Sequence, residues 1–225
     1  MVPSTAHLSH NDRVSSATSA SPSTHVSVKR PNVVTVGIIV WLASELMFFA
    51  GLFAMYFTHR SVAGPEMWAE STAYLDVPYA LTITIILVSS SFTCQFGVWA
   101  AAEHRRTRTG RIWQLTKWGM NEWLILTYLL GATFIAGQIL EYATLYAENL
   151  TMANSSFGSV FFMATGFHGI HVLGGLIAFL FVLGRSYATR RFTQHEENAM
   201  HAVSYYWHFV DAVWVALFIT IYFIQ

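Results

Sequence analysis

The chain has 225 residues and no net charge, and its composition is 54% hydrophobic and only 11% charged. Soluble domains carry about 25% charged residues, so this composition excludes an ordinary soluble domain, and the balanced charge gives no indication of nucleic-acid binding. The single Cys94 excludes an internal disulfide, and its apolar neighbours favour a packing role over a reactive thiol.

The first 31 residues differ in composition from the rest of the chain. They are rich in serine, contain no aromatic residue and lack the apolar segment of a secretory signal peptide. We therefore expect residues 1–31 to form a disordered polar cytoplasmic tail and residues 32–225 to form a membrane domain.

Five apolar segments follow the tail, and each is longer than the roughly 20 residues that cross the hydrocarbon core of a bilayer as a helix. They cover residues 33–57, 79–102, 123–147, 157–184 and 203–224. Together they contain only three charged side chains, and they lack the polar face that repeats every three or four residues in a soluble helix. The sequence therefore predicts an all-α bundle of five transmembrane helices.

Basic residues predict the orientation of this bundle. The tail and the connections 103–120 and 185–202 hold eleven of the twelve lysines and arginines, whereas the opposite side has only Arg60. The positive-inside rule assigns the basic side to the cytoplasm. We therefore expect the N-terminus inside the cell and the C-terminus outside.

Glu45 lies at the middle of the first predicted span, about 18 Å from either end at 1.5 Å per residue. An acidic side chain at this depth costs roughly 2.5–3.5 kcal/mol, so it should face protein or trapped water. Because burial disfavours the carboxylate, we expect a protonated, neutral group near pH 7. Glu45 is a candidate either for a structural hydrogen bond or for proton handling.

The fourth predicted span contains His168 and His171, whose spacing of three puts both rings on one face near the middle of the bilayer. A haem or metal site is one interpretation, but two neighbouring residues of one helix cannot supply both axial ligands of a haem. Hydrogen bonding between helices, or to a lipid head group, is the favoured role, and no metal site is predicted.

Two further pairs of polar residues are candidates for contacts inside the membrane or with lipid. In the last span His208 and Asp211, which follow Trp207, can form a charge-assisted pair. Near the outer end of the third span, Gln138 and Glu141 share a face, and Glu141 can reach water or lipid head groups. Neither pair specifies a reaction, and the sequence shows no nucleophile–base pair, phosphate-binding loop or redox motif.

Distinctive motifs occur in four of the five spans: Thr35–Gly37 with Ser44–Phe53 (SELMFFAGLF), Gln138–Tyr142, Phe157–Ser159 with Ala164–Val172 (ATGFHGIHV), and Tyr205–Trp214 (YYWHFVDAVW). In their sequence and order these stretches resemble the subunit III family of haem–copper oxidases, in its cytochrome c oxidase branch. Mitochondrial and many bacterial members have seven helices, so five predicted spans resemble a shorter bacterial form that includes actinobacterial members.

The resemblance implies a non-catalytic subunit of the oxygen-reducing enzyme in a bacterial plasma membrane. Members carry no haem or copper of their own, because these cofactors belong to partner subunits. Members also bind phospholipid in a cleft. They pack against the proton-pumping subunit I, beside subunit II, where they support proton uptake and prolong the working life of the complex. A cytochrome bc-type complex is a further expected partner. Glu45 matches the carbodiimide-reactive glutamate of the family.

Two alternatives remain open at this stage. A quinol oxidase also has a subunit III, although its members tend to carry aspartate at the position of Glu45, which favours the cytochrome c branch. An autonomous proton-coupled transporter could use Glu45 and the histidines as a proton relay. Transporters often contain internal repeats, and we find none among the five unequal spans.

Overall fold

The computed structural model describes residues 33–188 and 194–224, and this part of the chain contains helices and no strand. The expected tail, residues 1–31, lies outside the described residues. The helices are α1 (Val33–Ala63), α2 (Pro65–Thr72), α3 (Val77–Ala102), α4 (Met120–Ala147), α5 (Ser156–Ala188) and α6 (Gln194–Phe218). A short 3₁₀ turn, η1 (Leu115–Lys117), interrupts the α3–α4 connection, and a π-helical segment, η2 (Ile219–Phe223), continues α6.

Within the described residues, five helices are long and apolar enough to cross a membrane, which confirms the predicted number of spans. The helices extend beyond several of the predicted apolar segments: α1 continues to Ala63 and α5 to Ala188. Polar residues are compatible with these extensions, since the hydroxyls of Thr58 and Ser61 donate to backbone carbonyls one turn earlier in α1. Hydrophobicity therefore predicts the part of a helix that lies in hydrocarbon, whereas the helix itself continues beyond the end of the apolar segment.

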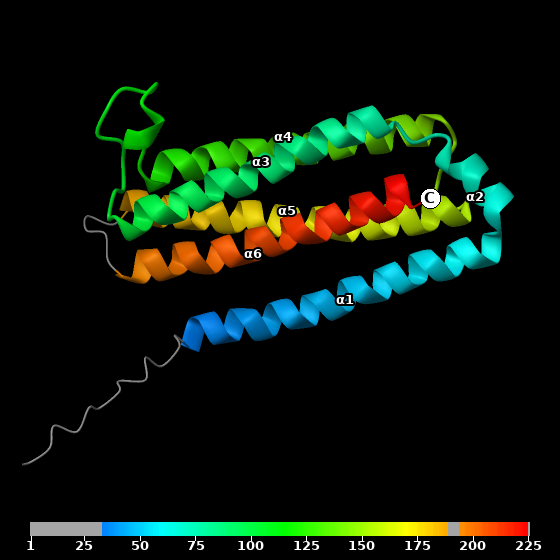
Figure 1. Cartoon of the computed structure of the whole chain (residues 1–225), viewed down its shortest axis with the longest axis horizontal. Helices are drawn as coiled ribbons and strands as arrows, with labels where there is room; N and C mark the ends of the chain where they lie inside the picture. The colour runs from blue at the N-terminus through cyan, green and yellow to red at the C-terminus, as the bar shows by residue number, and fades with distance from the viewer. Residues whose placement is uncertain (1–32, 189–193, 225) are drawn as a thin grey trace, which may run out of the picture. The chain divides into compact units, whose positions relative to one another are not determined.

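Side-chain packing holds the long helices in one bundle. Figure 1 shows α3 and α4 as an antiparallel pair that lies against α5 and α6, while α1 lies along the other side of α5 and α6. Large aromatic side chains fill the centre, and the largest fully buried ones include Trp207, Trp214, Phe134, Phe161 and Phe179. These rings supply dispersion contacts that are individually weak and collectively large.

Trp207 of α6 is accommodated by two glycines on neighbouring helices. A Cβ atom built on Gly131 of α4 would lie 2.7 Å from the indole, and one built on Gly175 of α5 would lie 2.7 Å from the same ring. Small residues at these positions let α4 and α5 approach one large ring of α6, as is common in membrane proteins. The indole Nε1 also donates to the Ser90 hydroxyl of α3, at 2.9 Å.

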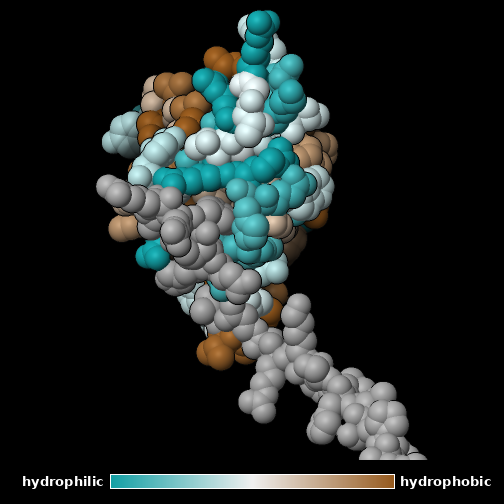
Figure 2. Space-filling model, turned by 90° about the vertical axis from the view of Figure 1, so that its left-hand side faces the viewer, coloured by the Kyte–Doolittle hydropathy of each residue, from teal (hydrophilic) through white to brown (hydrophobic). Residues whose placement is uncertain are grey.

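The two ends of the bundle differ in charge. One end carries the α3–α4 connection with its five basic residues, together with Arg185 at the end of α5. Figure 2 views this end and shows hydrophilic side chains gathered over it, with hydrophobic side chains at its rim. The connection is held by the Arg105 guanidinium, whose Nη1 donates to the carbonyls of Thr116 and Trp118 at 2.9 and 3.2 Å.

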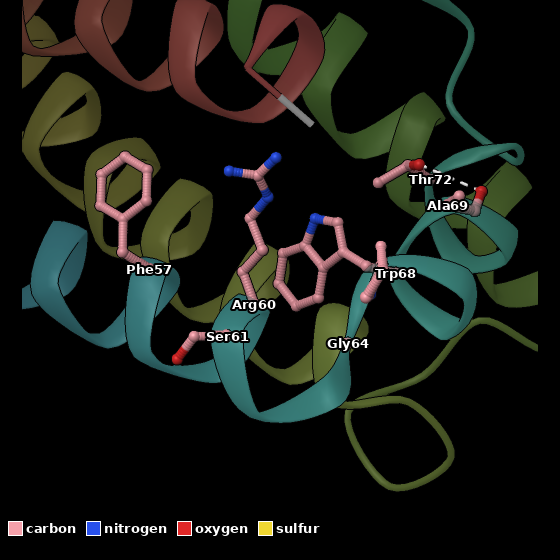
Figure 3. Close-up of a pocket in the computed structure, with 8 residues that line it drawn as sticks. Phe57, Arg60, Ser61, Gly64, Trp68, Ala69 and Thr72 are labelled. Carbon is pink, nitrogen blue, oxygen red and sulfur yellow. Dashed lines mark hydrogen bonds between the residues drawn. The ribbon is translucent and has the colours of Figure 1, made fainter.

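At the opposite end, the corner between α1 and α2 forms a pocket of about 500 Å³ (Figure 3). Gly64 makes the turn with φ of 79°, a conformation that strains other residues, and Pro65 then begins α2. Arg60 and Trp68 both line this pocket. The Trp68 ring packs edge-to-face on Tyr56 and on Phe157, each at 5.2 Å, so α2 is held against α1 and α5.

Candidate functional site

Glu45 of α1 and His171 of α5 meet inside the predicted hydrocarbon layer. The Oε2 atom of Glu45 lies 3.1 Å from Nε2 of His171, and both side chains are only partly exposed, at 21% and 15%. The rings of Phe48 and Phe49 lie 6.2 and 5.0 Å from the imidazole. The two candidates that the sequence placed at mid-depth on separate spans thus form one contact that joins α1 to α5.

The hydrogen bonds of His171 determine how protons are arranged in this contact. Nδ1 lies 2.7 Å from the backbone carbonyl of Phe167, which can only accept, so Nδ1 carries a hydrogen. Nε2 then either accepts a hydrogen bond from a protonated Glu45 or, in the imidazolium form, donates to its carboxylate. Both arrangements share one proton between the two side chains and have no net charge, which is why hydrocarbon tolerates the pair.

His168 has different surroundings from His171, although the two lie on one face of α5. Its side chain is completely buried, and neither ring nitrogen has a hydrogen-bond partner among the described residues. The imidazole lies 4.8 Å from the Trp214 ring and 6.0 Å from the Phe134 ring. The H-x-x-H pair therefore divides into a polar contact towards α1 and an aromatic contact inside the bundle.

His208 and Asp211 of α6 meet through a residue of another helix. The Ser91 hydroxyl of α3 donates to Asp211 Oδ2 and lies 3.0 Å from His208 Nδ1. His208 Nε2 lies 3.2 Å from Gln95 Oε1, one turn further along α3. The direct pair expected from the sequence is thus replaced by a bridge, because packing of α3 against α6 brings Ser91 between the two side chains.

Gln138 and Glu141 contact each other near the other end of α4. Gln138 Nε2 donates to Glu141 Oε2 at 3.1 Å, and the Tyr222 hydroxyl of η2 donates to Glu141 Oε1 at 2.5 Å. Glu141 is only 6% exposed. The end of α6 folds over Glu141 and supplies a hydrogen bond, while Glu141 also lines a small pocket of about 170 Å³ with Asp76 and Tyr79. Contact of Glu141 with water or lipid head groups stays a prediction.

Sequence reasoning missed the contribution of α3 to this polar network. Ser90 and Ser91 contact α6 residues, Gln95 contacts His208, and Thr84 accepts from the Trp214 indole at 3.0 Å. A signal was present, since Ser91 and Gln95 are four residues apart and share a helix face. In the described part of the chain, no group of three His, Cys, Asp or Glu side chains could hold a metal ion.

Carbodiimide labelling tests the accessibility and protonation of Glu45. A hydrophobic carbodiimide reacts with protonated carboxyl groups, and Glu45 is partly exposed, whereas Glu141 and Asp211 are buried. We expect labelling at neutral pH to fall at least tenfold in Glu45→Gln and to persist in Glu141→Gln, with peptide mass spectrometry as the measurement. Label found on Glu141 or Asp211 would show that Glu45 is not the reactive carboxyl group.

These features define a class of protein: a helical membrane protein with five spans and a polar network at mid-depth. A family model for cytochrome c oxidase subunit III matches residues 7–225. The chain is 52% identical over 207 residues to cytochrome c oxidase subunit 3 of Corynebacterium diphtheriae, a match that covers 92% of this chain and 95% of the relative.

Further relatives extend the match across bacteria. The chain is 50% identical over 199 residues to the probable cytochrome c oxidase subunit 3 of Mycobacterium leprae, covering 88% of this chain and 92% of the relative. It is 34% identical over 192 residues to the cytochrome c oxidase subunit 3 of a Synechocystis strain, covering 85% and 76%. The chain belongs to the cytochrome c oxidase subunit III family.

Proposed function

We propose that this chain is an accessory subunit of a proton-pumping cytochrome c oxidase, in which it supports proton uptake by subunit I and stabilises that subunit. The observation that carries the proposal is the family match over residues 7–225, with close relatives named as subunit 3 of this oxidase. In this assignment the haem and copper that reduce oxygen belong to partner subunits. The names of the relatives favour cytochrome c over quinol as the electron donor.

The Glu45–His171 contact supports a role in proton handling. The carboxyl oxygen and the imidazole nitrogen lie 3.1 Å apart at mid-depth, so a proton between them can be carried by either side chain. Proton movement within such a contact requires little motion of heavy atoms. A pair of this kind could support proton uptake by a neighbouring subunit without binding a redox centre.

Apolar grooves support the proposed binding of phospholipid. One groove of about 490 Å³ lies between α1, α5 and α6 and includes Trp41, Gly174 and Tyr206 in its lining. Another of about 650 Å³ is lined mainly by apolar residues of α5, with Arg185 at its end. Both have the shape and polarity that suit an acyl chain.

The charge difference between the two ends supports an orientation. The positive-inside rule assigns the end with the α3–α4 connection to the cytoplasm, and the end with Arg60 to the opposite side. In this orientation Glu45 and His171 lie between a basic cytoplasmic surface and the outer end of the bundle.

Purification of the tagged full-length chain from its native membrane tests the proposal. We expect haem-containing oxidase subunits to co-purify at a constant ratio, with an absorbance spectrum typical of haem. A copper-binding partner supports cytochrome c as the donor, and its absence from an otherwise intact oxidase favours quinol. A chain that purifies without oxidase subunits contradicts the proposal, and proton-coupled flux through the chain alone in liposomes would favour a transporter instead.

A further inference from the structure

We propose that the seam between α3 and α6 docks a transmembrane helix of another oxidase chain, an inference that rests on the proposed function. We define the α3–α6 seam by six residues: Ser91 and Gln95 of α3, and His208, Asp211, Ala212 and Ala216 of α6. The proposed partner helix presents a hydrogen-bonding side chain to the Gln95 amide group and packs closely along the two alanines.

The seam places polar groups deep in the hydrocarbon layer and leaves some of them at the surface. Ser91 and His208 lie within about 3 Å of the midpoints of their spans, and Gln95 lies about 8 Å from its midpoint, at 1.5 Å per residue. All three side chains are partly exposed. Lipid tails have no hydrogen-bonding groups, so an exposed polar side chain at this depth is normally covered by protein.

Gln95 is the group that most requires a partner. One atom of its amide group lies 3.2 Å from His208 Nε2, and no described residue makes a hydrogen bond to the other amide atom. Exposed hydroxyls elsewhere in the bundle differ from Gln95 in this respect. Ser89 and Thr133, for example, donate to carbonyls of their own helices at 2.7 and 2.8 Å, so they need no second chain.

The neighbouring surface of α6 has room for a close helix. Ala212 and Ala216 are exposed and four residues apart, so they form a shallow stripe beside His208. Small residues at this spacing allow two helix backbones to approach closely. Asp211, which precedes Ala212 in α6 and is only 4% exposed, has an Oδ1 atom without a hydrogen-bond partner among the described residues.

These observations determine the chemistry of the partner. An acyl chain would fill the stripe but would leave one atom of the Gln95 amide group unpaired, which is unfavourable away from water. A helix with a serine, threonine, asparagine or glutamine at mid-depth satisfies this amide and also fills the stripe. The partner is therefore a protein helix rather than a lipid.

Bulky substitutions on matched surfaces test the docking. Ala212→Trp fills the stripe, whereas Ala136→Trp places the same ring on the exposed face of α4 at nearly the same depth. We expect Ala212→Trp to reduce the haem that co-purifies with the tagged full-length chain at least tenfold, and Ala136→Trp to leave it within twofold of wild type. Equal recovery from the two variants, whether high or low, would overturn the docking surface.

Site-specific photo-crosslinking gives a second measurement that does not depend on disrupting the complex. A photoreactive phenylalanine analogue replaces Tyr205, which is 45% exposed near the seam, or Leu129, which is 55% exposed on α4. We expect a crosslink to another oxidase polypeptide from position 205 and at least fivefold less from position 129. Crosslinks only to lipid at position 205, or equal protein crosslinks from both positions, would contradict the proposal.

The same experiments separate this inference from the proposed function. If wild-type chain purifies without haem-containing subunits, the proposed function fails, and the docking surface fails with it. If wild type and both tryptophan variants retain haem equally, the proposed function stands and only the assignment of the α3–α6 seam is wrong.

Discussion

Replacing Gly175 with valine is expected to lower the midpoint of thermal unfolding in detergent by roughly 6–12 °C. A Cβ atom at this position lies 2.7 and 2.8 Å from Cε3 and Cζ3 of Trp207, which is closer than side-chain carbons approach in proteins. The indole cannot move away easily, because Gly131 contacts its other edge and Ser90 accepts from its Nε1. Overpacking of this kind costs about 3 kcal/mol, and for a chain of this size each kcal/mol shifts the midpoint by about 2–4 °C.

Gly184 of the same helix provides a matched control. A Cβ atom built there has no heavy atom within 4 Å, so Gly184→Val changes helix propensity without a clash. We expect its unfolding midpoint to stay within about 2 °C of wild type. Equal destabilisation by the two valines would show that the cost arises from the helix backbone and not from the Trp207 contact.

A double mutant tests whether the strain caused by a larger side chain at position 175 arises at the Trp207 indole. Trp207→Phe removes one ring and opens space opposite Gly175, so the pair Gly175→Ala with Trp207→Phe should be more stable than the sum of the single changes predicts. We expect a coupling free energy of at least about 1 kcal/mol, because residues in direct contact are not additive. Additive behaviour would contradict the close approach of α5 and α6 at this point.

Replacing Glu141 with leucine is the second change with a large expected effect, a loss of about 3 kcal/mol in the free energy of unfolding. The carboxyl group accepts from both Gln138 and Tyr222 in a buried site, and leucine removes both acceptors at once. A buried donor that loses its partner costs about 1–3 kcal/mol. The contact also joins α4 to the end of α6, so we expect faster hydrogen exchange in residues 219–223 together with the lower unfolding midpoint.

Glu141→Gln separates hydrogen bonding from charge. The new Oε1 still accepts from Tyr222, and the new amide can donate to Oε1 of Gln138, which has no partner in the described part of the chain. Only a rotation of the Gln138 amide group is required. We expect a loss below about 1 kcal/mol. A loss as large as that of Glu141→Leu would indicate that the carboxyl group itself is required.

Much of the fold follows from local properties of the sequence. Five apolar segments predict five helices, because a helix satisfies its own backbone hydrogen bonds in hydrocarbon and needs no information about its neighbours. The depth of Glu45 and His171 follows equally from counting residues along each predicted span, whereas the central position of His208 appears only once α6 is seen to begin before the predicted span. The short helix α2 was not predicted, since its eight residues are too few and too polar to mark a membrane span.

The partners of the polar residues could be found only in three dimensions. Glu45 meets His171 across 126 residues, Ser91 joins His208 to Asp211, and Glu141 is covered by Tyr222. In a bilayer the lipid-facing and protein-facing sides of a helix are both largely apolar, so hydropathy determines that a helix crosses the membrane but not which face turns towards which neighbour. The rotation of each helix is decided instead by the fit of side chains such as Trp207 between Gly131 and Gly175. The sequence by itself thus determined the number of spans and the depth of Glu45 and His171, and the tertiary packing decided which polar groups meet.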